Sequence, residues 1–157
     1  MHKIVSNLLS IESELKIKIE KLNLKEYRPT IIAVSKTFAM QDILPLINHG
    51  HIHFGENKVQ EAVEKWTDIK NDFKHIKLHM IGKLQTNKVK YVVPLFDYIH
   101  SVDSIKLAEK ISKEQIKHKK KIKIFIQINI GNEYQKSGIL IDQLDLFYKK
   151  CIEDYGL

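Results

Sequence analysis

Hydrophobic residues follow two patterns along this chain: short apolar runs, and longer segments with apolar residues three or four positions apart. The first pattern is typical of strands in a buried parallel sheet, and the second of amphipathic helices that pack on one. The apolar runs predict strands at 31–34, 52–55, 78–81, 98–100 and 122–130. The periodic segments predict helices at 3–22, 40–48, 58–69, 82–92, 105–116 and 140–152.

After the first helix, strand and helix alternate five times without a long spacer. Strands joined in this way lie parallel, so the fold class is α/β, as an open doubly wound sheet or as part of an eight-fold barrel. The 157 residues suit one domain, 1–157.

Local signals refine some boundaries. Asn57 is a candidate cap for the helix after it, with Gln60 reaching back, and Pro94 is expected to stop the helix that starts near Gly82. The four aliphatic residues at 31–34 predict a strand covered on both faces.

Composition narrows the function classes. The net charge is +7, yet Arg28 is the only arginine, which argues against base-specific recognition of nucleic acid. A lone Cys151 excludes an internal disulfide. Glu12 and Glu14 interrupt the apolar pattern near the N-terminus, so we expect no signal peptide or membrane span and a cytoplasmic protein.

Three groups of basic residues each have more than one interpretation. The basic run 117–123 lacks aromatic residues and arginine, which favours a solvated helix end over a nucleic-acid site. His51 and His53 share a strand face as zinc ligands can, but no cysteine or carboxylate lies close in sequence. His79 and His100, on neighbouring strands, either interact in the core or line a barrel.

Polar residues follow each predicted strand, where parallel α/β folds build their active sites. They are Ser35-Lys36-Thr37, Gly55-Glu56-Asn57, Gly82-Lys83-Leu84-Gln85, Ser101-Val102-Asp103 and Asn129 to Gly138. From this pattern alone, Lys36 is either a site amine or the first solvated residue after a strand, and helix capping suffices for Glu56 and Asn57.

Five motifs, in order, resemble the pyridoxal 5'-phosphate homeostasis protein family. They are Ala33-Val34-Ser35-Lys36-Thr37, Phe54-Gly55-Glu56-Asn57 with Val59-Gln60-Glu61-Ala62, Ile81-Gly82 with Leu84-Gln85-Thr86-Asn87-Lys88, His100-Ser101-Val102-Asp103, and Lys136-Ser137-Gly138. The resemblance implies an incomplete parallel (β/α) barrel of the TIM type, similar to the N-terminal domain of alanine racemase. About five of eight βα units are expected, with an extra N-terminal helix.

The same resemblance implies a pyridoxal 5'-phosphate-binding protein of vitamin B6 and amino-acid homeostasis, with the cofactor held as a Schiff base on Lys36. Asn57 and Ser101 would contact the cofactor, Gly82 would let its ring approach the backbone, and Lys136 would be a second amine for the aldehyde. Family members are carriers and regulators without an established turnover reaction. The implied partners are pyridoxal phosphate and the apo forms of enzymes that use it, and the resemblance implies a monomer for the full-length family.

The family's chain continues through three more βα units, whereas this sequence stops at Leu157. Phosphate sites in such barrels are commonly built after strands seven and eight, so we expect a truncated chain that binds the cofactor weakly and associates through its open edges. The alternatives are a racemase-like enzyme, which needs a second opposed base, and a non-functional truncated remnant.

Overall fold

The computed structural model describes residues 2–133 and 135–157, which form a parallel sheet of five strands in the order β1-β2-β3-β4-β5. The strands are β1 (Ala33–Val34), β2 (His53–Glu56), β3 (Lys77–Met80), β4 (Tyr98–Val102) and β5 (Lys123–Ile126). The helices are α1 (Lys3–Lys21), α2 (Met40–Asn48), α3 (Val59–Asp72), α4 (Val89–Leu95), α5 (Ile105–His118) and α6 (Leu144–Glu153), with short 3₁₀ turns at Thr86–Lys88 and Ile141–Gln143.

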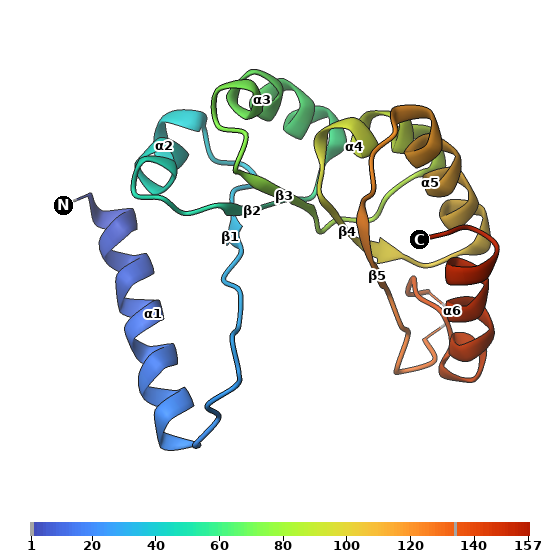
Figure 1. Ribbon diagram of the computed structural model, residues 1–157, viewed down its shortest axis with the longest axis horizontal. Coiled ribbons are helices and arrows are strands. Elements are labelled where there is room, and N and C mark those ends of the chain that lie inside the picture. The colour runs from blue at the N-terminus through green and yellow to red at the C-terminus, as the bar shows by residue number, and fades with distance from the viewer. Residues whose placement is uncertain (1, 134) are drawn as a thin grey trace.

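Each strand pairs with the next one along the chain, and a helix connects each pair (Figure 1). Helices α2 to α5 follow one another around the outside of the curved sheet, while α1 stands beside β1 at one end (Figure 1). Sequential parallel order with outer helices is the arrangement of a (β/α) barrel, of which five units are present. The predicted fold class and the extra N-terminal helix are therefore confirmed.

The core lies between the sheet and its outer helices. Phe54 of β2 and Trp66 of α3 are fully buried, with ring centroids 5.0 Å apart. Leu78, Ile99 and Val92 are also fully buried. Large apolar side chains of this kind each contribute roughly 1.5–3 kcal/mol when they leave water, so this layer fixes the helices on the sheet.

The two edge strands differ from their predictions. The run at 31–34 forms a ladder only at Ala33–Val34, and Val34 is 47% exposed rather than covered on both faces. It is an edge strand with a neighbour on one side only. The fifth strand is also shorter than 122–130, since only an isolated bridge between Ile128 and Ile139 extends the pairing beyond β5.

Several predicted helix boundaries are wrong. The helix expected from Gly82 begins at Val89, and the helix expected from residue 140 begins at Leu144, each after a 3₁₀ turn. Lys58, not Asn57, is the N-cap residue of α3, and it makes no side-chain cap. Gln60 instead donates to Glu64 within the helix.

Pro94 lies inside α4 and does not stop it. The helix ends one residue later, so the missing proline N–H removes few helical bonds. Lys120 Nζ donates to the carbonyl of Pro94 at 3.0 Å, and Lys70 Nζ donates to that of Leu95 at 3.0 Å. Cations at these last carbonyls stabilise a helix C-terminus.

Helix α1 has the predicted length, but its apolar stripe is only partly covered. Val5 and Leu8 are buried against the rest of the chain, whereas Ile11 and Leu22 are exposed. None of the helices in the described part of the chain combines the length and hydropathy needed to cross a bilayer.

Three histidines form a ladder across β2, β3 and β4. Nδ1 of His53 lies 2.9 Å from Nε2 of His79, and Nδ1 of His79 lies 2.9 Å from Nε2 of His100. Tyr98 stacks on His79 with centroids 4.2 Å apart, and Phe125 stacks on His100 at 4.4 Å. His79 and His100 therefore interact directly, which is one of the two alternatives that the sequence left open.

This ladder disfavours protonation. Burial, followed by the charges of His100 and His53, lowers the pKa of His79 from 6.5 to about 4. Burial also lowers the pKa values of His53 and His100. Between the two values of His79, the unfolded chain binds more protons than the folded chain, so stability is complete above about pH 6.5 and falls as the pH decreases toward 4.

We therefore predict that the wild-type chain loses about 2 kcal/mol of unfolding free energy between pH 7.5 and pH 5 through His79. Urea titrations at a series of pH values measure this loss. His79→Gln removes the titrating ring and should flatten the dependence, whereas His75→Gln, at an exposed position, should not. Identical pH profiles for wild type and His79→Gln would contradict the assignment.

Candidate functional site

Four of the five predicted site residues lie at the carboxyl edge of the sheet. Lys36 is two residues beyond β1, Asn57 follows β2, and Gly82 is two residues beyond β3. Ser101 is the penultimate residue of β4. Because the strands are parallel, these positions share one edge, as the sequence predicts.

Gly82 is in direct contact with both Asn57 and Ser101. A Cβ atom added to Gly82 would lie 2.2 Å from the carbonyl oxygen of Asn57 and 2.8 Å from its Cα. On the other side, the Ser101 hydroxyl donates to the Gly82 carbonyl at 2.7 Å. The glycine is thus required by the close approach of two backbone segments, and the serine fixes that approach.

The Asn57 side chain carries an unused acceptor. Its Oδ1 atom is shielded from solvent and has no hydrogen-bond partner among the described residues. Buried polar atoms are nearly always paired, and an unpaired one costs about 1–3 kcal/mol. A ligand that donates a hydrogen bond at this edge would remove that cost.

Lys36 has a side chain exposed to solvent and a backbone held on both sides. No carboxylate in the described ranges forms an ion pair with its ammonium group. The preceding residue, Ser35, is buried, and its N–H donates to the Gly55 carbonyl at 3.0 Å. The following residue, Thr37, donates its N–H to Glu61 Oε1 at 2.8 Å. The amine is therefore accessible while its attachment point is fixed.

Glu56 is the functional-site residue that sequence reasoning missed. Its side chain is fully buried, and Oε1 accepts from Ser35 Oγ at 2.7 Å, Trp66 Nε1 at 2.9 Å and Lys65 Nζ at 3.0 Å. Helix capping, which sufficed for Glu56 in the sequence, is not its role. The signal was the lysine and tryptophan nine and ten positions later, on the helix that covers this strand.

Lys136 lies in the loop after β5, away from the contacts described above. Its ammonium group pairs with Glu133 Oε1 at 2.5 Å, and its side chain is mostly exposed. Asn129 shapes this loop because its amide donates to the Glu133 carbonyl at 2.9 Å. Nothing in the described contacts brings Lys136 to Lys36.

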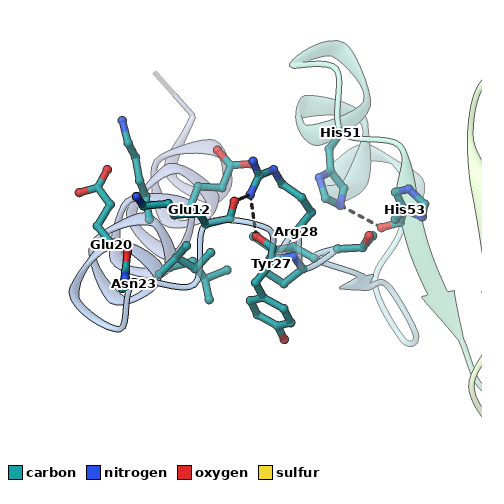
Figure 2. Close-up of a pocket in the computed structure, with 14 residues that line it drawn as sticks. Glu12, Glu20, Asn23, Tyr27, Arg28, His51 and His53 are labelled. Atoms are coloured by element: carbon teal, nitrogen blue, oxygen red, sulfur yellow. Dashed lines mark hydrogen bonds between the residues drawn. The ribbon is translucent and has the colours of Figure 1, made fainter.

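A cavity of about 780 Å³ lies at the other end of the first strands. It is enclosed by the second half of α1, the segment from Asn23 to Ile31, and His51 and His53 at the start of β2 (Figure 2). Arg28 folds back within this segment and donates to the carbonyls of Lys25 and Tyr27. Lys36, Asn57, Gly82 and Ser101 do not line this cavity, so it is separate from the carboxyl-edge site.

A curved parallel sheet with outer helices and a free lysine after its first strand defines the class: the chain is part of a (β/α) barrel with a polar carboxyl edge. Comparison with known families makes this specific. The family described as "Alanine racemase, N-terminal domain" matches residues 13–157, and the chain belongs to it.

Curated relatives narrow the comparison. The chain is 36% identical over 136 residues to the pyridoxal phosphate homeostasis protein of Pasteurella multocida, covering 87% of this chain and 58% of that protein. It is 32% identical over 146 residues to the protein of the same name from Escherichia coli K12, covering 92% and 62%. The resemblance inferred from the five motifs is thus confirmed.

Solved structures agree. PipY of Synechococcus elongatus, in a structure with PLP bound, matches with a TM-score of 0.65 and 34% identity over 82% of this chain and 59% of that one. The same protein without PLP matches with a TM-score of 0.67 and 35% identity. The chain therefore spans about three fifths of the length of its relatives.

Gly82→Ala tests the close approach at the site. We predict a loss of about 2 kcal/mol in unfolding free energy, because the new methyl group meets the Asn57 backbone rather than a flexible side chain. Gly131→Ala is the matched control, since its Cβ would meet only the end of the Glu133 side chain. Equal unfolding midpoints for the two variants in urea would refute this packing.

Proposed function

We propose that this chain binds pyridoxal 5'-phosphate as a Schiff base on Lys36 and serves vitamin B6 homeostasis as a carrier. The observation that carries this proposal is the geometry at Lys36, an exposed amine without an ion-pair partner among the described residues, on a backbone held from both sides. A primary amine in this state is available to attack an aldehyde. The homology to proteins named for pyridoxal phosphate homeostasis supports the same ligand.

The neighbouring residues fit a flat, polar ring. Gly82 would lie beside the ring, but the space left by its missing side chain is filled by the Asn57 backbone, so it shapes the site by that backbone contact. The unpaired Asn57 Oδ1 would accept from a donor on the cofactor. The Ser101 hydroxyl already donates a hydrogen bond to the Gly82 carbonyl, so toward a ligand it would act as an acceptor.

The cofactor would supply an electrophilic carbon, an aldehyde when free and an imine when joined to Lys36, which would pass to another amine by exchange and release the lysine. We propose Lys136 as a second amine for this exchange, and apo forms of enzymes that use pyridoxal phosphate as acceptors. Loop movement would then be required, because Lys136 is paired with Glu133 in the loop after β5. We further propose that 1–157 acts as one cytoplasmic unit.

Attachment to Lys36 gives a direct test. Adding pyridoxal phosphate should produce an absorbance band near the visible edge, as the amine displaces the aldehyde oxygen as water. Borohydride then delivers hydride to the carbon–nitrogen double bond, and peptide mass spectrometry should locate the product at Lys36. Lys36→Arg keeps the charge but should lose most of this product, whereas Lys83→Arg should keep it. A label spread evenly over the lysines would sink the proposal.

The racemase alternative makes a different prediction. A racemase exchanges the α-hydrogen of its substrate with solvent, which needs two bases on opposite faces of the cofactor. We expect the chain with pyridoxal phosphate in deuterium oxide to incorporate no more deuterium into alanine than free pyridoxal phosphate does. Incorporation that exceeds this background and disappears in Lys36→Arg would establish an enzyme.

A further inference from the structure

The peptide groups on both sides of Lys36 are held by side chains of α3. Lys65 Nζ donates to the Ser35 carbonyl at 2.9 Å, and Glu61 Oε1 accepts from the Thr37 N–H at 2.8 Å. Lys65 and Glu61 lie one helical turn apart on α3, with Nζ and Oε1 separated by 3.5 Å. One turn of one helix therefore grips the chain before and after the lysine.

Strand pairing holds this segment only as far as Ser35, whose N–H donates to the Gly55 carbonyl. The β1 ladder ends at Val34, and β1 has a neighbour on one side only. Thr37 has a φ of +67°, a left-handed conformation that a residue with a branched side chain rarely adopts. Such a conformation persists only where surrounding contacts enforce it, and the bond to Glu61 is such a contact.

Lys65 is anchored in the protein interior by Glu56, and Glu61 is linked to that anchor through Lys65. Lys65 Nζ lies 3.0 Å from Glu56 Oε1, with side-chain exposures of 10% and 0%. A buried carboxylate and its buried cation hold each other in one geometry, because separating them would leave an unpaired charge. Donation from the Thr37 N–H is the main factor that lowers the pKa of Glu61, which keeps the group ionised as an acceptor.

We propose that Glu61 and Lys65 are positioning residues that hold Lys36 at the carboxyl edge of the sheet through hydrogen bonds to its flanking peptide groups. The inference rests on the proposed function of Lys36, but the clamp itself is a property of the backbone. It assigns to α3 a role that plain ion pairing between Lys65 and the two glutamates does not include.

Two substitutions of Glu61 distinguish the effect of its side-chain length from the effect of its charge. Glu61→Gln keeps an oxygen at the same reach for the Thr37 N–H but removes the charge. Glu61→Asp keeps the charge but shortens the side chain by one methylene. The clamp requires Glu61→Gln to resemble wild type and Glu61→Asp to fail, whereas ion-pair stabilisation of α3 requires the reverse. Glu64→Asp, the same truncation at an exposed position of α3, is the control.

Amide hydrogen exchange, measured by NMR on the 157-residue chain, tests the hydrogen bond at the Thr37 N–H without any cofactor. We expect Thr37 to exchange about tenfold faster in Glu61→Asp than in wild type, Glu61→Gln or Glu64→Asp. Both Glu61 variants are conservative, and the exchange of core amides checks that each one folds. Unchanged Thr37 exchange in Glu61→Asp would overturn the clamp.

The rate at which borohydride traps pyridoxal phosphate on Lys36 measures how the clamp affects the reactivity of that lysine. It should fall about tenfold in Glu61→Asp and stay near wild type in Glu61→Gln. Faster Thr37 exchange with an unchanged trapping rate would overturn the positioning role. No trapping on Lys36 even in wild type would overturn the proposed function instead, and Thr37 exchange would still decide whether the clamp exists.

Discussion

The candidate site depends on one buried oxygen, Oε1 of Glu56. It accepts hydrogen bonds from the Ser35 hydroxyl, the Lys65 ammonium and the Trp66 indole, and so joins the end of β1 to both β2 and α3. A carboxylate is very expensive to bury without partners, and charge-assisted bonds of this kind are about twice as strong as neutral ones. Because β1 has a two-residue ladder and one neighbour, this oxygen supplies the attachment that strand pairing does not.

A second set of contacts organises the rest of the edge, and it involves backbone rather than charge. Gly82 packs against the Asn57 backbone and accepts from Ser101, so the ends of β2, β3 and β4 are fixed relative to one another. The histidine ladder links the same three strands through their side chains. The strand ends thus form a rigid frame, on which small groups such as the Asn57 amide keep their positions.

The order and direction of all five strands follow from the sequence, because alternating strands and helices of these lengths have few other solutions. The number of neighbours of each strand and the burial of individual side chains do not follow from the pattern. The four aliphatic residues at 31–34 have the composition of a buried strand, but this composition does not show how many neighbouring strands it has. Glu56 before Asn57 looks like a helix start, and its buried role depends on Lys65 and Trp66, which lie nine and ten positions later on α3. Lys36 could be chosen as a candidate because the order of motifs, unlike burial, can be read directly from the sequence.

The structure gives its two central lysines opposite tasks. Lys65 has a nearly buried ammonium group, committed to Glu56, Glu61 and the Ser35 carbonyl. A group with three such partners cannot attack another molecule without first breaking these hydrogen bonds. In Lys36 the flanking peptide groups make the hydrogen bonds instead, and no described residue has to be displaced from its amine before that amine reacts. Holding a reactive side chain by its backbone keeps the position fixed and the reactive atom free, which an ion pair at the amine itself does not allow.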